Sequence, residues 1–314
     1  MRPDEYAAMY AVEDEHWWYV GMRRVADALL RDRFNGARDR GYRGRSPRSE
    51  GRRARSRRAR RGEPCGEGQL GFPNSEDRLN ILDAGCGTGG NSAHLRAYGR
   101  VTGVDFSADA LRFAAERPGL RLARASVEAL PFADASFDLV LSNDVLCHLG
   151  VASDAVAVRE FARVLRPGGV LFLQLPAYEW LRSHHDAAVH TGHRYTAAEM
   201  RALLRAGGLQ PRRVTYANAA LLPAAAAWRV LHRLLPDRAE DARSDVRPVA
   251  GPLNAVMRAV LDLESRLLAR RNLPWGLSVI GVAENTAGRA RSDRASTREA
   301  VAARSSPAPP SAVR

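Results

Sequence analysis

The chain opens with an amphipathic helical pattern and, after a long polar interval, alternates between strand-like and helix-like stretches. Apolar residues recur from Met22 to Leu30 at spacings of three and four, the period of a helix with one buried face, and the pattern stops near Phe34. From Asn80 onward, short apolar runs of strand length alternate with helical patterns. This alternation is typical of a doubly wound sheet with parallel strands, and it predicts an α/β fold of the Rossmann-like kind.

The alternation predicts seven strands and the helices that connect them. One helix is expected over 155–169, where Pro and Gly residues end it. Two more helical stretches, 219–235 and 253–270, form an insertion before the last strand. The predicted strands cover residues 80–83, 100–105, 120–126, 137–143, 170–176, 211–217 and 275–284.

These patterns divide the chain into four parts. Residues 1–35 are expected to form an N-terminal helical cap, and residues 77–285 the α/β domain, with its helical insertion at 217–272. Between them, residues 36–76 are dense in Arg, Gly and Ser and almost without aliphatic side chains. Such a segment cannot bury enough apolar surface to offset its ordering entropy, so we expect a disordered insertion. The polar, Pro-rich residues 286–314 are expected to form a disordered tail.

The formal charge of +13 is concentrated in two places. Residues 36–61 contain twelve Arg against two acids, a net charge of +10, and residues 288–314 contain six Arg against two acids, a net charge of +4. Subtracting both from +13 leaves −1 for the rest of the chain, so the folded part is nearly neutral. An Arg-rich segment can neutralise phosphates, which favours weak contact with nucleic acid or an anionic surface. The alternative is a solvated insertion without a partner.

Cysteine content and hydropathy limit the class of protein further. Cys65, Cys86 and Cys147 are an odd number at unrelated spacings, which indicates neither a disulfide framework nor a zinc site. The first residues contain no apolar signal sequence, and no stretch reaches the ~18 uncharged apolar residues that a transmembrane helix needs. We therefore expect a cytoplasmic protein without a transmembrane segment. The sequence does not indicate an oligomeric state.

A glycine-rich turn follows the first predicted strand. The stretch ILDAGCGTGG, residues 81–90, is a strand that ends in an acid and leads through closely spaced glycines into a helix. Glycines at such a turn let the backbone approach a ligand and adopt positive φ, while the helix N-terminus presents free N–H groups. Asp105 ends the second strand about twenty residues later, where an acid can accept hydrogen bonds from both ribose hydroxyls of a bound nucleoside.

Four blocks of the sequence resemble the class I S-adenosylmethionine-dependent methyltransferases of the methyltransferase-11 type. The blocks are ILDAGCGTGG, VTGVDFS, ASVEALPFADASFDLVLSNDVLCHL and REFARVLRPGGVLFLQLP, which lie between residues 81 and 176 in the order of the family. Outside them, an E-x-x-H-W-W-Y stretch at 13–19, a histidine-containing loop at 185–196 and a closing LPWGLSVIGVA resemble a subgroup of bacterial methyltransferases. Genes of this subgroup often accompany glycan or lipid-linked saccharide synthesis.

The resemblance implies S-adenosyl-L-methionine as the cofactor and assigns residues to it. The acid and glycines of the turn would hold its methionine end, and Asp105 its ribose. Two departures are Ser126, where many relatives have Asp, and Cys147, where Glu is common. The residues implied to bind the cofactor are Asp83, Gly85, Cys86, Gly87, Thr88, Gly89, Asp105, Phe106, Ser126, Val127 and Asn143.

The function predicted first is transfer of a methyl group to a small-molecule substrate such as a saccharide, a lipid-linked intermediate or a natural product. The sulfonium methyl is already electrophilic, so the enzyme must chiefly align a nucleophile and exclude water, with a general base where an oxygen or nitrogen carries a proton. A second hypothesis is an RNA or protein methyltransferase that uses the Arg-rich insertion. A third is a protein that binds S-adenosylmethionine without catalysis. The atom that is methylated stays open.

Histidines supply the candidate catalytic groups. The loop after the fifth strand contains His184, His185, His190 and His193, and it leaves the carboxyl end of a strand, where open α/β sheets bind ligands. Three interpretations compete: loop-anchoring or surface residues, substrate contacts or a general base, and metal ligands. The last has the least support because no acid–histidine spacing matches a known metal site, so no metal is predicted. His185, His193 and His16 are the candidate catalytic residues.

Three consecutive aromatic residues, Trp17, Trp18 and Tyr19, cannot all lie on one buried face of a helix or strand. One hypothesis is that the Trp rings only pack the N-terminal helix onto the sheet. The other is that one ring packs while another closes the substrate pocket, with Glu15 and His16 facing the substrate. The two helical stretches between 219 and 270 also leave alternatives, namely packing within the chain, a hydrophobic substrate pocket, or contact with a lipid surface.

Overall fold

The structure is a computed structural model that describes residues 3–31, 78–182, 186, 190–227 and 249–287. The predicted Arg-rich insertion and most of the predicted tail lie outside the described residues. The described N-terminal part contains two helices, α1 (Pro3–Val12) and α2 (Trp17–Leu29). The second begins at Trp17 rather than at Met22, because the His16 side chain accepts a hydrogen bond from the Trp18 N–H and caps the helix.

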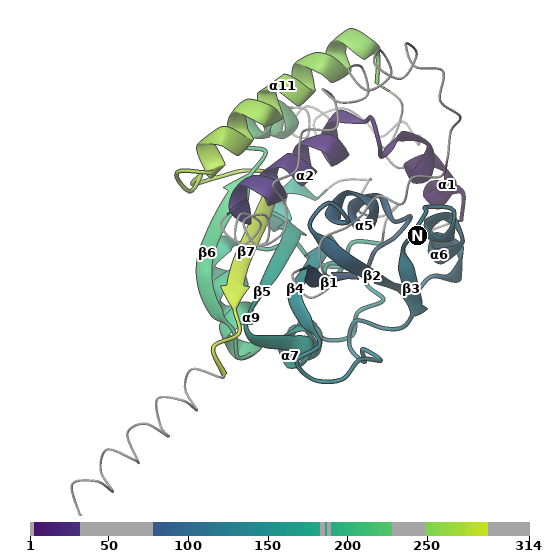
Figure 1. The fold of residues 1–314 in the computed structure, drawn as a ribbon. Helices are drawn as coiled ribbons and strands as arrows, with labels where there is room; N and C mark the ends of the chain where they lie inside the picture. The colour runs from purple at the N-terminus through teal and green to yellow at the C-terminus, as the bar shows by residue number, and fades with distance from the viewer. Residues whose placement is uncertain (1–2, 32–77, 183–185, 187–189, 228–248, 288–314) are drawn as a thin grey trace, which may run out of the picture.

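Seven strands form one sheet in the order β3-β2-β1-β4-β5-β7-β6 (Figure 1). The strands run in parallel except for β7, which is antiparallel to both β5 and β6. The predicted doubly wound sheet of seven strands is confirmed, whereas the expectation of a wholly parallel sheet was wrong at its last strand. The strands are β1 (Leu79–Ala84), β2 (Gly99–Asp105), β3 (Arg121–Arg124), β4 (Phe137–Asn143), β5 (Leu165–Pro176), β6 (Gln210–Ala217) and β7 (Ser278–Glu284).

The helix predicted over 155–169 ends earlier than expected. Helix α7 covers Asp154–Val164, and β5 already begins at Leu165. The reason is tertiary: the N–H of Gly168 donates to the carbonyl of Asn285, and the Asn285 N–H donates back to Gly169. Pairing with the far end of the chain thus extends the strand through a Pro-Gly-Gly stretch that is typical of a helix stop.

Buried side chains fill both faces of the sheet. On one face, α7 and α9 (Ala197–Ala206) cover a cluster that includes Phe161, Leu171 and Met200. On the other, α2, α5 (Gly90–Leu95) and α11 (Gly251–Leu268) cover a cluster that includes Val25, Ile81 and Phe172. Helix α6 (Ala108–Ala115) connects β2 to β3, and the one-turn helix η1 (Glu179–Leu181) follows β5.

Helices α2 and α11 lie side by side over the second face, although they are far apart in the sequence (Figure 1). Their contact is so close that a Cβ built on Gly21 would lie 2.2 Å from the Leu261 side chain. The Trp17 N–H donates to the side chain of Asn254 at the start of α11. The predicted helical stretch 253–270 is therefore α11, and it packs within the chain on its inner side. Of the stretch 219–235, residues 222–227 are helical, and residues 228–235 lie outside the described residues.

Candidate functional site

The glycine turn joins β1 to α5 at the carboxyl edge of the sheet. Its N–H groups at Gly85 and Cys86 both donate to the carbonyl of Val104 in β2, at 2.7 and 2.8 Å. Gly85, Gly87 and Gly89 all adopt positive φ, between 54° and 83°, which L side chains rarely do. A Cβ at Gly85 would in addition lie 2.1 Å from the Val145 side chain. The turn therefore requires glycine for its geometry as well as for access.

Two carboxylates flank this turn. Asp83 lies at the end of β1 with 1% of its surface exposed and accepts a 2.5 Å hydrogen bond from the Ser92 hydroxyl. Burial raises the pKa of Asp83 to about 7, against the lowering effect of that hydrogen bond. Asp105, at the end of β2, accepts from the Gly87 N–H at 2.9 Å and from the Ser107 N–H at 2.8 Å. The second acid thus also holds the turn in place.

Two residues of the turn face away from the space above it. Cys86 is buried, and its Sγ would lie 2.9 Å from a Cβ built on Gly103 in β2. The Thr88 side chain is wholly buried and donates a hydrogen bond to Glu13. Both residues were predicted to bind the cofactor; in the structure their side chains hold the turn against β2 and against the N-terminal segment, and the Cys86 N–H and the Thr88 carbonyl are also bonded within the protein.

Phe106, Ser126 and Val127, which were predicted to bind the cofactor, lie at the ends of β2 and β3. Phe106 is 73% exposed, an unusual environment for a large apolar ring, with the Arg124 guanidinium 5.9 Å from its centroid. The Ser126 hydroxyl accepts from the Glu128 N–H, whereas the Val127 side chain belongs to the buried core. An exposed ring beside Asp105 is what a base-stacking position requires, while Val127 contributes backbone only.

Asp144, directly after β4, and Gln174, near the end of β5, form a polar pair that was not predicted. The Gln174 amide donates to Asp144 at 2.8 Å, and the Asp144 N–H donates to the Gln174 carbonyl at 2.9 Å. Burial raises the pKa of Asp144 to about 6, although Gln174 and the charge of Arg194 lower it. The side-chain oxygens Asn143 Oδ1 and Gln174 Oε1 are buried and have no hydrogen-bond donor among the residues that the structure describes. Buried oxygens of this kind are expected to be paired, so they mark a place for a ligand.

The strand-end positions of Asn143 and Gln174 could have been read from the sequence, although the bond between Gln174 and Asp144 could not. Asn143 and Gln174 are register partners at the carboxyl ends of neighbouring parallel strands, and both strands were predicted with these residues at or near their last positions. Asp144 has a positive φ of 54°, which the sequence does not signal because the residue is not a glycine.

The N-terminal segment covers the glycine turn. Glu13 is 4% exposed and accepts from Thr88 Oγ1 at 2.5 Å and from Arg117 Nη2 at 2.7 Å. Burial raises the pKa of Glu13, while its bonds to Thr88 and Arg117 act in the opposite direction. The Met9 methyl group would lie 3.2 Å from a Cβ on Gly87. The chain ahead of the first strand is therefore part of the site.

The aromatic stretch divides its roles within one turn of α2. Trp18 packs against the core cluster on its face of the sheet, and Trp17 meets Trp18 edge to face. Tyr19 is half-buried, and its pKa is raised by burial first and then by the charges of Glu13 and Asp144. Tyr19 therefore lies within electrostatic range of both the covering segment and the end of β4. The ring of His16 accepts a hydrogen bond as a helix cap, and burial lowers its pKa.

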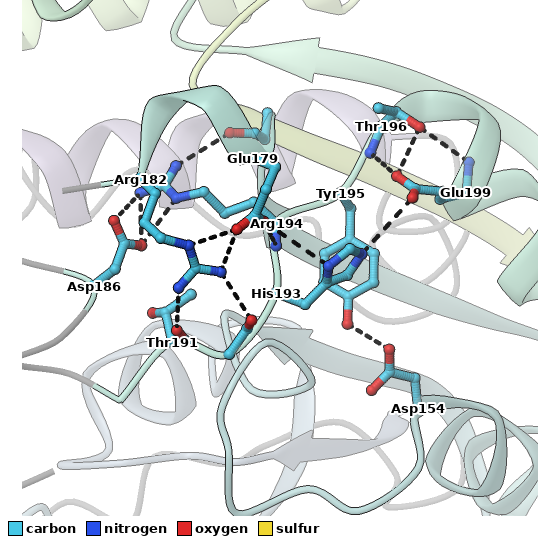
Figure 2. Close-up of polar contacts among 12 residues, drawn as sticks. Asp154, Glu179, Arg182, Asp186, Thr191, His193, Arg194, Tyr195, Thr196 and Glu199 are labelled. Atoms are coloured by element: carbon cyan, nitrogen blue, oxygen red, sulfur yellow. Dashed lines mark hydrogen bonds and ion pairs between the residues drawn. The ribbon is translucent and has the colours of Figure 1, made fainter. Parts of the chain in front are cut away.

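The loop after β5 is held by ion pairs (Figure 2). Arg194 and Asp186 form a buried pair with bonds of 2.9 and 3.0 Å, and Arg194 also donates to the carbonyl of Ala177. His193 is 49% exposed and lies within 4 Å of both Glu179 and Glu199, with its ring edge-on to Tyr195. His185 lies outside the described residues. In the described part of the loop, Arg194 forms the anchoring bonds. Anchoring of the loop was one of the three interpretations of its histidines.

The described residues hold neither a metal-binding cluster nor a membrane-spanning helix. They contain no group of three or more His, Cys, Asp or Glu side chains arranged to hold a metal ion. Among the described helices, none has the length and apolar content to cross a membrane. The predicted interpretation of the histidine loop as a metal site gains no support from the residues described there.

Comparison with known proteins gives consistent matches. A family model for a methyltransferase domain matches residues 82–173. A malonyl-[acyl-carrier protein] O-methyltransferase of Pseudescherichia vulneris is 31% identical over 211 residues, which are 63% of this chain and 81% of that protein. The same-named protein of Erwinia pyrifoliae is 44% identical over 120 residues, 35% of this chain and 43% of its own length. A fatty-acid O-methyltransferase of Mycolicibacterium smegmatis is 38% identical over 118 residues, 34% of this chain and 42% of its own length.

The extent of these matches differs between relatives. The chain spans less than half the length of the Erwinia and Mycolicibacterium relatives, and four fifths of the Pseudescherichia protein. The region matched by the family model, 82–173, contains the glycine turn, Asp105, Asn143 and Asp144. It does not contain the N-terminal segment or α11.

Proposed function

The chain belongs to the class I S-adenosylmethionine-dependent methyltransferases, and on that premise we propose that it transfers a methyl group to an oxygen of a small-molecule substrate. The observation that carries the proposal is the convergence of the glycine turn, Asp83 and Asp105 at the carboxyl ends of adjacent strands, beneath the N-terminal segment. This is the edge at which open α/β sheets bind their ligands.

The residues at this edge fit the cofactor of the family. S-adenosylmethionine carries an ammonium group and two ribose hydroxyls, all of them hydrogen-bond donors. Asp83 and Asp105 are acceptors, and Asn143 Oδ1 is a buried oxygen without a donor among the described residues. A positive φ at Gly87, with only the Met9 methyl group near its missing Cβ, leaves the backbone open to close approach. The exposed ring of Phe106 lies next to Asp105, where it can stack on the base.

In the proposed mechanism, the cofactor supplies an electrophilic methyl group and the protein aligns the substrate. The N-terminal segment excludes water from the turn through the buried contacts of Glu13. Asp144 is ionised above pH of about 6 and can accept the proton that a substrate hydroxyl releases as its oxygen is methylated. Gln174 orients that carboxylate through its amide N–H. For the general base we propose Asp144, held by Gln174, in place of His16, whose ring caps α2. His193, an exposed loop residue, remains a candidate.

Two classes of substrate follow from different observations. The unpaired oxygen of Gln174 and the carboxylate of Asp144 favour a substrate with hydroxyl hydrogens, such as a saccharide or a natural product. The relatives named as malonyl-[acyl-carrier protein] and fatty-acid O-methyltransferases favour an acyl carboxylate. A carboxylate substrate is an anion and would meet the negative charge of Asp144, so we place it second. Methylation of RNA or protein through the Arg-rich insertion stays a prediction, since that segment lies outside the described residues.

A labelled-methyl transfer assay tests the proposal. The purified chain is incubated with methyl-labelled S-adenosylmethionine and small-molecule fractions of the source cell, with fatty acids and malonyl thioesters as a second set and RNA as a third. We expect labelled product that resists mild alkali, because methyl ethers are stable where methyl esters hydrolyse. Alkali-labile label would move the acyl class to first place. Asp105→Ala is the matched blank, and label in none of the sets, with no binding of S-adenosylhomocysteine by calorimetry, would refute the proposal.

A further inference from the structure

Helix α11 has an apolar stripe on its outer side. Its inner side is buried at Leu261 and Leu268, which pack toward α2 and the sheet. The outer stripe recurs at spacings of three, four and seven residues, so it runs along one side of the helix for about four turns. Its members are Leu253, Val256, Leu263 and Leu267, with 55%, 59%, 61% and 36% of their surfaces exposed.

An exposed aliphatic stripe of this length is unusual on a soluble domain. At about 1.5 Å per residue, the 18 residues of α11 extend about 27 Å along the surface. Trp275, seven residues after the end of α11, is 54% exposed, and an exposed tryptophan ring suits a membrane interface. The inner contacts already account for the place of α11 in the fold, so the outer stripe has no role in packing against the described part of the chain.

Basic side chains border the stripe. Arg266, Arg270 and Arg271 are exposed near the end of α11. The two acids of the helix are engaged: Asp262 pairs with Arg24 and Arg266, and Glu264 is buried and accepts the Ala219 N–H. The charge on this side of the molecule therefore complements an anionic partner.

We propose that the outer stripe of α11 docks the protein on an anionic lipid bilayer surface. An in-plane helix with aliphatic residues on one side and arginines beside them is the arrangement that binds such surfaces through apolar burial and charge together. A second copy of this chain fits the stripe less well, because it would bring the arginines that border its own stripe to the same contact. The proposal is independent of methyl transfer and does not require that activity.

Vesicle flotation with the full chain tests this surface. The probes are vesicles of phosphatidylcholine alone and of phosphatidylcholine with an equal part of phosphatidylglycerol, at low and high salt. We expect flotation with the anionic vesicles, weakened by salt. The variant Val256→Ser/Leu263→Ser should lower the partition coefficient by about tenfold, because two aliphatic side chains leave the bilayer. Leu149→Ser, which removes an equally exposed leucine distant from α11 in sequence, is the matched control and should float as the wild type does.

Each other outcome overturns the proposal. Absence of flotation with anionic vesicles refutes it directly. If Leu149→Ser lost as much flotation as the double variant, binding would depend on exposed apolar residues in general and not on the stripe. Flotation that survives Val256→Ser/Leu263→Ser but disappears when residues 38–61 are deleted would assign it to the arginine segment alone. A dimer that sediments in the wild type and dissociates in the double variant would make the stripe an interface between copies. Leu263→Trp keeps the apolar contact, and quenching of its fluorescence by brominated lipid checks the result if the double variant unfolds.

Discussion

The hydroxyl of Thr88 donates a 2.5 Å hydrogen bond to the carboxylate of Glu13, and both side chains are buried. Thr88 belongs to the glycine turn and Glu13 to the segment between α1 and α2. The Arg117 guanidinium, at the end of α6, donates to the same carboxylate and to the carbonyl of Thr88. The turn, the covering segment and the helix after β2 are thus joined at one buried carboxylate.

Replacing this carboxylate should therefore affect stability and ligand binding together. Glu13→Gln keeps the shape but removes the charge that Arg117 meets, and breaking a buried pair of this kind costs about 3 kcal/mol. We expect the free energy of unfolding in urea to fall by about that amount, with weaker binding of S-adenosylhomocysteine. Asp14→Asn is the matched control, because Asp14 pairs with the same arginine at 3.1 Å but is 61% exposed. Equal stability of the two variants would contradict the assigned role.

Asp105 is expected to contribute to the turn as well as to the ribose. In the structure its carboxylate accepts the N–H groups of Gly87 and Ser107, so Asp105→Ala leaves both without their partner. We expect S-adenosylhomocysteine binding to weaken by about 1–3 kcal/mol in calorimetry, together with a lower melting temperature. Asp109→Ala, in the first turn of α6, is the comparison. A variant at position 105 that loses affinity with no change in melting temperature would restrict its role to the ligand.

The backbone geometry of the glycine turn follows from the sequence more directly than the contacts around Asp144 and Glu13 do. The glycine turn, Asp105 and the strand ends follow from local pattern, because the turn needs glycines and the acids stand at strand ends. The pairing of Asp144 with Gln174 depends on two strands that are 30 residues apart, and no local pattern signals it. The burial of Glu13 likewise depends on contacts with Thr88 and Arg117, which only the folded chain brings together.

The predicted elements failed where tertiary contacts overrode local preference. The Pro-Gly-Gly stretch after α7 is a helix stop by composition, yet Gly168 and Gly169 pair with Asn285 and continue a strand. The antiparallel direction of β7 could not be inferred from its apolar run, since a buried strand of either direction has the same composition. For the loop after β5, the sequence left three interpretations of its histidines open and gave no signal of the buried Arg194–Asp186 pair that holds the described part of it.

Binding of S-adenosylhomocysteine should release a proton from Asp83. Burial raises its pKa to about 7, above the ordinary carboxyl value, so the folded protein without ligand retains a proton there up to about that pH. The free energy of unfolding should therefore fall as pH rises from about 4 to about 7, because the native state binds more protons than the unfolded state in this window. An ammonium group beside Asp83 favours the ionised carboxylate, so binding of S-adenosylhomocysteine should release a proton below pH of about 7 and tighten as pH rises toward that value.

Calorimetry in buffers of different ionisation enthalpy measures this release. At pH of about 6.5, the wild type should show a buffer-dependent enthalpy, and Asp83→Asn, which cannot ionise, should show much less. Ser92→Ala removes the hydrogen bond that lowers the pKa of Asp83, and it should move the transition to higher pH. If Asp83→Asn released as many protons as the wild type on binding, the proton would come from another group.

The three neighbouring aromatic residues should separate into packing and substrate roles. Trp18 packs against the core, so Trp18→Ala should lower the free energy of unfolding by about 2–3 kcal/mol and leave the affinity for S-adenosylhomocysteine unchanged. Tyr19→Phe removes only the hydroxyl, whose pKa is raised by burial and by the charges of Glu13 and Asp144, and no cavity results. We expect its stability to change by less than about 0.5 kcal/mol while labelled-methyl transfer falls at saturating cofactor.

Trp17→Ala is the comparison for both variants, because Trp17 meets Trp18 edge to face at the start of α2 and is not one of the buried core residues. It should be intermediate in stability and unaltered in turnover. Stability is measured by urea unfolding and turnover by the labelled-methyl assay with the substrate fraction found active. The substrate role belongs to Tyr19 if Tyr19→Phe alone loses turnover. Loss of turnover in Trp17→Ala with a wild-type Tyr19→Phe variant would assign the closing ring to Trp17 instead.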